Sequence, residues 1–231
     1  MEEQGSQKKS YYKVIDYIKN EIRVGRLESG GKLPTERDLS ELLGVSRNSV
    51  REAMRSLEII GVISSHQGAG NYLTGSFEQS LVESLSMMFL LNRIDYRQIS
   101  QLRRGLELQA LMLAIDRITD EEINGLKEII SQLENETEAI NTILDKRFHY
   151  NIARASRNVL ITNILQALSD LLDSFISDLR RDILSAEDSR IILREAHNEM
   201  LKSLLLRDKD LAREAINKHF GIIDEKLRDK A

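Results

Sequence analysis

Residues 33–58 read LPTERDLSELLGVSRNSVREAMRSLE, the pattern of two short helices joined by a tight turn. Thr35 is placed to cap the first helix, and Gly44 to end it, because glycine accepts the left-handed backbone of a helix terminus. Ser46 is placed to cap the second helix. The second helix carries one apolar face, formed by Val50, Ala53 and Leu57. These features predict a helix-turn-helix.

A different face of the second helix carries arginine at every fourth position, at Arg47, Arg51 and Arg55. Guanidinium groups on an exposed helix face suit the phosphates and guanine edges of a DNA major groove. The alternative is a row of solvated charges, and for Arg55 an ion pair with Glu52 or Glu58 competes with DNA contact. We interpret the row as a DNA-binding face.

The sequence on either side of this motif completes a small domain. Residues 11–25 carry isoleucines at helical spacing, which predicts an amphipathic helix that packs under the motif. Residues 62–63 and 72–73 have the character of two short strands, and the glycine-containing segment between them that of a hairpin tip. Together these elements predict a winged helix-turn-helix domain over residues 1–75. The isoleucines are Ile15, Ile18 and Ile22.

The remaining residues, 76–231, have a helical pattern throughout and contain no proline. The segment from Thr119 to Glu122 has the form of a capping box at the start of a helix. Short connections between helices predict an antiparallel all-α bundle of six or seven members, so the fold class is mainly α. The expected helices span residues 78–92, 96–117, 120–138, 139–156, 159–184, 187–206 and 209–229.

Composition sets limits on the class of protein. The 231 residues are 41% hydrophobic and 30% charged, and no apolar run has the length of a membrane span. There is no cysteine and no apolar leader segment, so we expect a cytoplasmic protein without a membrane partner. The net charge of −4 hides a weakly positive first domain, which suits docking at selected DNA sites.

Three of the four histidines fall in the helical region, and their spacing indicates a second site. Asp145 and His149 are four residues apart, so both side chains project from one helix face. His197 and His219 lie on the last two expected helices, each flanked by apolar residues. If they converge inside the bundle, these four side chains could hold a divalent transition metal. Hydrogen-bonded core histidines and a solvent-facing aspartate are the alternative.

In its helix-turn-helix and its Asp and His positions, the chain resembles the FadR-type branch of the GntR family of bacterial transcription regulators. Its LPTERDLSELLGVSRNSVREAMRSLEIIGVI is similar to the family's DNA-binding core, and QLRRGLELQALMLA resembles the first ligand-domain helix. Two further stretches resemble the metal-binding segments of the family's C-terminal domain: DKRFHYNIARASRNVL and REAHNEMLKSLLLRDKDLAREAINKHF. The resemblance implies a metal site in the C-terminal domain, with zinc as the first expectation and nickel or manganese as alternatives. Its ligands would be Asp145, His149, His197 and His219.

The resemblance also implies which residues contact DNA and effector. Asn48-Ser49 stands where many relatives have Thr-Pro, and His66-Gln67 where many have two arginines. The resemblance therefore carries over the docking mode, but not the operator sequence or the strength of the wing contact. Arg103 matches an arginine that can face the effector pocket, although an ion pair with Glu107 is an equal alternative. The implied DNA contacts are Arg37, Ser46, Arg47, Asn48, Arg51, Gln67 and Gly68.

The function implied is that of a homodimeric regulator, most simply a repressor, which binds double-stranded operator DNA and responds to a small organic acid at the metal site. A direct metal sensor is one alternative. A metal-dependent enzyme is another, but the chain has no HExxH motif and no general base placed beside the histidines, so we expect no catalytic residues and no enzyme activity.

Overall fold

The computed structural model describes residues 2–74, 78–133, 138–171 and 187–228. The chain forms two compact units, Met1–Glu83 and Ser84–Ala231, which are described separately. The division between these units falls inside helix α4 (Glu78–Asn92), a few residues beyond the domain boundary that the sequence places after residue 75. The position of the functional boundary stays a prediction.

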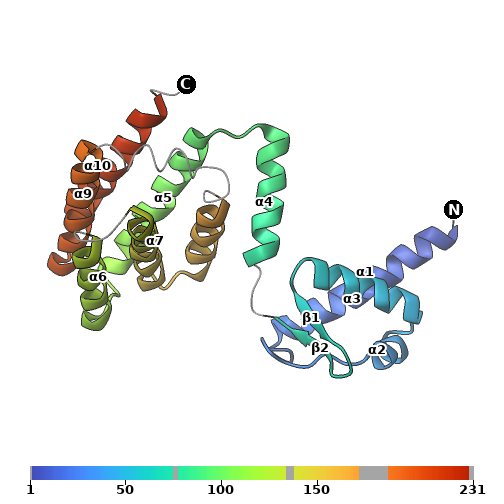
Figure 1. The fold of residues 1–231 in the computed structure, drawn as a ribbon. Helices are drawn as coiled ribbons and strands as arrows, with labels where there is room; N and C mark the ends of the chain where they lie inside the picture. The colour runs from blue at the N-terminus through green and yellow to red at the C-terminus, as the bar shows by residue number, and fades with distance from the viewer. Residues whose placement is uncertain (1, 75–77, 134–137, 172–186, 229–231) are drawn as a thin grey trace. The chain divides into compact units, whose positions relative to one another are not determined.

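The first unit is a winged helix-turn-helix, as the sequence predicts (Figure 1). Helix α1 packs against α3 and α2, and the two strands pair antiparallel with Ile63 opposite Leu73. The core of the unit includes Ile18, Leu39 and Val50, all fully buried. Its elements are α1 (Glu2–Arg23), α2 (Glu36–Leu43), α3 (Arg47–Ile59), β1 (Ile63–His66) and β2 (Gly70–Leu73).

The expected helix caps are confirmed. The Thr35 hydroxyl accepts a hydrogen bond from the Asp38 amide, and the Asp38 carboxylate accepts one from the Thr35 amide, both at 3.2 Å. Gly44 ends α2 with a left-handed φ of 62°. The Ser46 hydroxyl accepts a hydrogen bond from the Ser49 amide at 3.1 Å. These local bonds fix where both helices of the motif begin and how the turn is made.

Helix α1 departs from the expectation. It begins at Glu2 and ends at Arg23 instead of spanning residues 11–25, and Ile22 is 39% exposed. Among residues 10–23 of α1, the buried apolar positions are Val14 and Ile18. The helix ends early because the chain turns back, and the Arg26 side chain donates hydrogen bonds of 2.5 and 2.6 Å to both oxygens of Glu21.

The hairpin also differs from the expectation in its extent. Its strands cover residues 63–66 and 70–73, and Val62 lies outside because its amide bonds to the Leu57 carbonyl in the turn after α3. The segment before α2 pairs with the other edge of β2: the Gly30 amide donates to Leu73, and the Leu33 amide to Asn71, both at 2.8 Å. This pairing joins the wing to the start of the helix-turn-helix.

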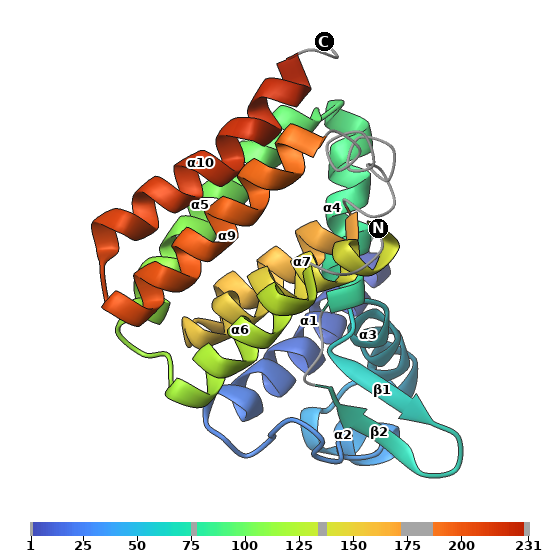
Figure 2. The ribbon, with the colours of Figure 1, turned by 60° about the vertical axis from the view of Figure 1, so that its left-hand side comes forward.

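The second unit is an all-helical bundle, as expected (Figures 1 and 2). Helix α10 packs against α9 and α5, and α6 packs against α7 and α9. Phe148 and Phe220 are among its largest buried side chains. Among the described residues no helix has the length and apolar character needed to cross a membrane. After α4 the bundle contains α5 (Tyr96–Ile115), α6 (Asp120–Leu133), α7 (Glu138–Ala155), a helical segment at 159–171, α9 (Glu187–Leu206) and α10 (Lys209–Arg228).

The helix bounds agree with the sequence expectation to within a few residues where the structure describes them. Helix α5 ends at Ile115 instead of residue 117, and the expected ends of two helices, 134–137 and 172–184, lie outside the described residues. The capping box of α6 is confirmed, since the Thr119 amide donates to Glu122 at 3.0 Å and the Glu122 amide to the Thr119 hydroxyl at 3.3 Å.

Candidate functional site

Helix α3 separates an apolar face from a basic one. Val50, Ala53 and Leu57 are 0%, 0% and 2% exposed and pack into the core of the first unit. Arginines 47, 51 and 55 are all exposed. The arginine row therefore points away from the core and is available to a ligand, which is what a recognition helix requires.

The other residues implied in DNA contact also lie at the surface. Arg37 is on α2, with its Nε 3.8 Å from a carboxylate oxygen of Glu41. Ser46 and Asn48 are exposed at the start of α3. Arg51 faces α2, where its Nε and Nη2 donate to Oε2 of Glu36 at 3.3 and 3.2 Å. Their contact with DNA stays a prediction.

The tip of the wing carries Gln67 and Gly68, both exposed in the turn between β1 and β2. Gly68 has a φ of 76°, a conformation that residues with a Cβ rarely adopt, so glycine is required to close this turn. Behind the tip, the Tyr72 ring packs edge-on against His66, with ring centroids 5.4 Å apart. The contact of the tip with DNA likewise stays a prediction.

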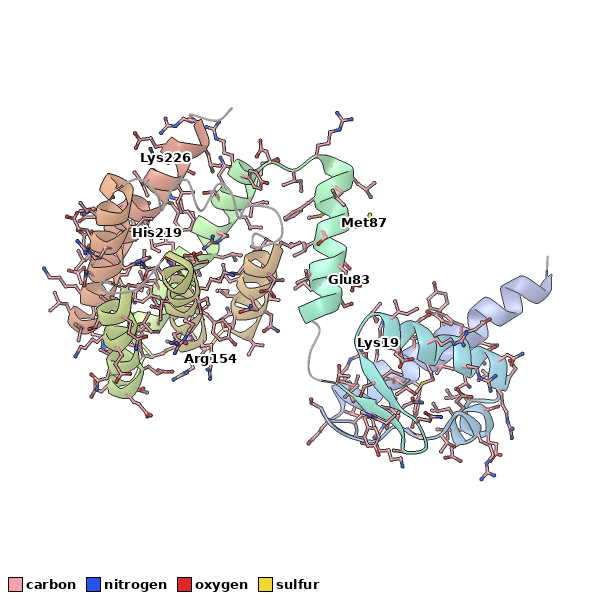
Figure 3. The ribbon with its side chains drawn as sticks, viewed as in Figure 1. Lys19, Glu83, Met87, Arg154, His219 and Lys226 are labelled. Atoms are coloured by element: carbon pink, nitrogen blue, oxygen red, sulfur yellow. The ribbon has the colours of Figure 1, made fainter. Side chains whose placement is uncertain are left out.

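In the second unit, histidines from three helices converge. The rings of His149 on α7, His197 on α9 and His219 on α10 have centroids 4.8–5.1 Å apart (Figure 3 labels His219). His149 Nε2 lies 3.2 Å from His197 Nε2. Asp145 Oδ1 lies 3.2 Å from His197 Nε2 and 3.7 Å from His149 Nε2. All four residues that the sequence singles out thus meet at one place in the bundle.

Several observations indicate that this cluster could hold a divalent metal. Two donors bound to one Zn²⁺ at about 2.0–2.2 Å and a tetrahedral angle lie roughly 3.4 Å apart, close to the separations of Asp145, His149 and His197. His219 is 3% exposed, and its Nδ1 has no hydrogen-bond partner among the described residues. A buried imidazole nitrogen without a partner is unfavourable unless a ligand satisfies it. Three imidazoles and one carboxylate form a donor set typical of zinc and related metals.

Glu107 on α5 is a member of the site that the sequence reasoning considered only as an ion-pair partner of Arg103. Its Oε2 lies 2.8 Å from His149 Nδ1, and its Oε1 accepts hydrogen bonds from Arg103 at 2.7 and 3.0 Å. A carboxylate on the outward nitrogen of a histidine fixes which nitrogen faces a metal. A sequence signal for this role is the position of Glu107 on the apolar stripe of α5 that includes Leu111 and Ala114, which indicates a buried carboxylate. In the structure Glu107 is 5% exposed.

The charges of the cluster compensate each other. Burial lowers the pKa of His149, but the facing carboxylates of Glu107 and Asp145 raise it to about 9. Burial raises the pKa of Glu107, but the Arg103 guanidinium and His149 hold it well below its usual range. Burial lowers the pKa of both His197 and His219, the latter strongly, so these rings are neutral and keep a lone pair for a metal.

One side of the cluster opens into a cavity of about 310 Å³, in the size range of small-molecule sites. Asp145 and His149 lie in its wall beside Arg103. Arg103 is held by Glu107, and its guanidinium lies 5.8 Å from the centroid of the Phe220 ring. The ion pair expected as one alternative for Arg103 is therefore present, and the arginine lines the cavity as well. Further lining comes from Lys146, Arg147, Tyr150, Leu165, Gln166 and Ser169.

Comparisons with known proteins agree with this architecture. Residues 10–73 match the model of the bacterial regulatory proteins of the gntR family, and residues 98–221 match that of the FCD domain. The first match covers the helix-turn-helix and wing. The second covers more than half of the chain and includes the whole histidine cluster.

Relatives of similar length are named as regulators. The chain is 29% identical to the HTH-type transcriptional regulator YcbG of Bacillus subtilis, over 93% of this chain and 88% of that protein. It is 29% identical to the putative L-lactate dehydrogenase operon regulatory protein of Escherichia coli, over 93% and 85%. The structure of Streptococcus agalactiae GntR matches with a TM-score of 0.69 and 25% identity, over 96% and 100%. The chain belongs to the GntR family of DNA-binding transcription regulators, in the FadR-type branch with a C-terminal FCD domain.

Proposed function

We propose that this regulator is a homodimeric repressor whose operator affinity is controlled by a small carboxylate effector bound at a divalent metal in the second unit. The observation that carries the proposal is the meeting of Asp145, His149, His197 and His219 beside an open cavity of about 310 Å³. Asp145 and His149 are the members of the cluster that line this cavity. Zinc is the first choice of metal, with nickel or manganese as alternatives.

The chain's own residues favour an anion in this cavity. When bound, the metal would supply a fixed positive charge in a site of low dielectric, which attracts carboxylate oxygens. Arg103 adds a guanidinium that Glu107 and Phe220 hold in place, and Lys146 and Arg147 lie in the same wall. A carboxylate that touches both the metal and this basic wall would be bound more tightly than a neutral molecule of the same size.

DNA recognition would use the arginine row of α3. A two-fold dimer presents two recognition helices to successive turns of the major groove, so we expect a pseudo-palindromic operator. Arg37, Ser46, Arg47, Asn48 and Arg51 would contact the major-groove side, and Gln67 and Gly68 the adjacent minor groove.

Effector binding would reach the DNA-binding domain along the chain. Helix α4 connects the wing to α5, and α5 carries both Arg103 and Glu107 at the cavity. A shift of α5 on effector binding would therefore be passed to the segment that leads into the DNA-binding domain. A coupling of about 1–3 kcal/mol, typical of allosteric proteins, is enough to release an operator.

The test is His149→Ala in the full chain, with wild-type protein as reference. An operator is first selected from random duplexes, and affinity is then measured with zinc and a panel of small organic acids. We expect the variant to lose bound metal by elemental analysis and to lose the response to acids. Its affinity without acid should stay within about twofold of wild type, because His149 belongs to the second compact unit and α3 to the first. If the variant loses operator affinity in the absence of acid as strongly as it loses the response to acids, His149 has a structural role and the effector role is contradicted.

The same protein, operator, zinc and acids also test the two alternative functions, a direct metal sensor and a metal-dependent enzyme. If the metal itself is the signal, titration with zinc in the absence of any acid changes operator affinity. If the protein is an enzyme, incubation with the acids and metal converts them, whereas a sensor returns its ligand unchanged.

A further inference from the structure

The ion pair between Arg51 and Glu36 joins the recognition helix to the helix before it. Nε and Nη2 of Arg51 both donate to the same oxygen, Oε2 of Glu36, at 3.3 and 3.2 Å. Among the described residues, neither Arg47 nor Arg55 has an ion pair of this kind. Arg51 is therefore the member of the row whose guanidinium has a defined orientation.

The carboxylate that makes this contact is itself held in place. Glu36 is the first residue of α2, directly after the Thr35 cap, where a negative charge is favoured by the helix dipole. The helix is anchored by Leu39, which is fully buried in the core of the first unit. Glu36 is thus presented toward α3 from a short helix that the capping box and the core fix in position.

The contact occupies one edge of the guanidinium and leaves another. The edge formed by Nε and Nη2 faces Glu36, so the end formed by Nη1 and the second Nη2 hydrogen stays available. Guanine is recognised by two parallel N–H groups that donate to O6 and N7. An arginine fixed in this way loses less side-chain freedom on binding than a mobile one, which favours the base contact.

The same carboxylate works against the competing contact. A phosphate that approached Arg51 near its Nε edge would meet the negative charge of Glu36, which is 34% exposed. This repulsion applies at every DNA sequence, whereas the base contact is made at the correct base only. The effect of Glu36 is therefore expected on the ratio of specific to non-specific binding more than on total affinity.

We propose that Glu36 is a specificity-determining positioning residue, which orients Arg51 to read a base edge and discourages its use as a general phosphate contact. The inference rests on the proposed docking of α3 in the major groove. Because both side chains are partly exposed, the pair adds little to fold stability, so its loss affects recognition without unfolding the domain.

The test is selection from a library of random duplexes with the full chain, followed by affinity measurements on the selected site and on a scrambled duplex of equal length. Arg51→Ala identifies the base pairs that Arg51 reads. We expect Glu36→Ala to lose preference at those same base pairs, to bind the scrambled duplex as tightly as wild type or more tightly, and to lower the affinity ratio by about tenfold. Glu36→Gln keeps an acceptor oxygen, so we expect it to retain most of the preference at those base pairs.

Glu41→Ala is the matched control at the Arg51 base pairs, because Glu41 is an exposed acid on the same helix that pairs with Arg37 and not with Arg51. We expect it to keep the wild-type preference at the Arg51 base pairs. The inference is overturned if Glu36→Ala retains its preference at the Arg51 base pairs, if it weakens all duplexes equally, or if Glu41→Ala loses the same preferences. A wild-type protein that selects no site at all would instead overturn the proposed function, and this inference with it.

Discussion

The carboxylate of Glu107 lies 2.8 Å from Nδ1 of His149, while Nε2 of the same ring faces His197 and Asp145. A residue of α5 therefore decides how a histidine of α7 is presented to the centre of the cluster. Because Glu107 also accepts two hydrogen bonds from Arg103, it links the candidate metal ligands to the wall of the cavity.

This relationship gives a prediction for Glu107→Gln. The amide preserves the shape of the side chain but removes the charge that holds the His149 N–H, so we expect zinc affinity to fall by about 10- to 100-fold, the usual effect of losing a carboxylate behind a histidine ligand. The measurement is competition with a chelator of known zinc affinity, on full-length protein.

Glu195→Gln provides the control for Glu107→Gln, since Glu195 is a half-exposed acid on α9 that pairs with Lys218 at 2.9 Å. We expect its zinc affinity to match that of wild type. Unchanged affinity in Glu107→Gln, with metal still bound by the histidines, would show that Glu107 has no part in presenting His149.

The features that the sequence predicted well are short-range ones. The caps at Thr35 and Ser46 and the turn at Gly44 depend on bonds within five residues, so their residue types are enough to identify them. The pairing of Asp145 with His149 across one helical turn could be predicted in the same way. That His197 and His219 join them follows from the apolar residues beside each, which place both rings toward the bundle interior.

The features that the sequence did not predict depend on contacts between distant segments. The contact of Glu107 with His149 joins two helices, and no spacing rule connects α5 to α7. Pairing of residues 30–33 with β2 uses backbone groups, which leave no signal in side-chain type. On α1 the isoleucine spacing predicts burial of Ile22, but the helix packs through Val14 and Ile18, and Ile22 in its last turn is 39% exposed.

Two glycine substitutions should have opposite effects on stability. Gly44 has a φ of 62° at the end of α2, so Gly44→Ala is expected to destabilise the first unit by about 1–2 kcal/mol. Gly125 lies inside α6 with open space around an added Cβ, so Gly125→Ala is expected to stabilise the second unit by about 0.5–1 kcal/mol. Hydrogen exchange of core amides reports the stability of each unit separately. Effects of the same sign at both positions would contradict the explanation from backbone conformation.

Arg207 is expected to stabilise the second unit by completing the end of α5. Its guanidinium donates through Nη1 to the Ile115 carbonyl and through Nη2, at 3.0 Å, to the Ile118 carbonyl, both of which lie at or just after the last turn of that helix. Carbonyls at a helix end have no partner within the helix, and bonds from a charged donor to them are stronger than neutral ones. We expect Arg207→Ala to lower the free energy of unfolding by about 2–3 kcal/mol.

The comparison variant for this last prediction is Arg213→Ala on α10, where the arginine makes an exposed ion pair with Asp210 three residues away. Such pairs contribute little, so we expect a change below about 0.5 kcal/mol. Arg207 has a φ of 56°, and alanine at that position keeps the same unfavourable backbone, so the difference between the two variants reports the guanidinium contacts. Denaturant unfolding, with hydrogen exchange at the Ile115 and Ile118 region, measures both. If Arg207→Ala is as mild as Arg213→Ala, the end of α5 is held by the packing of its apolar residues, and the two carbonyl bonds are dispensable.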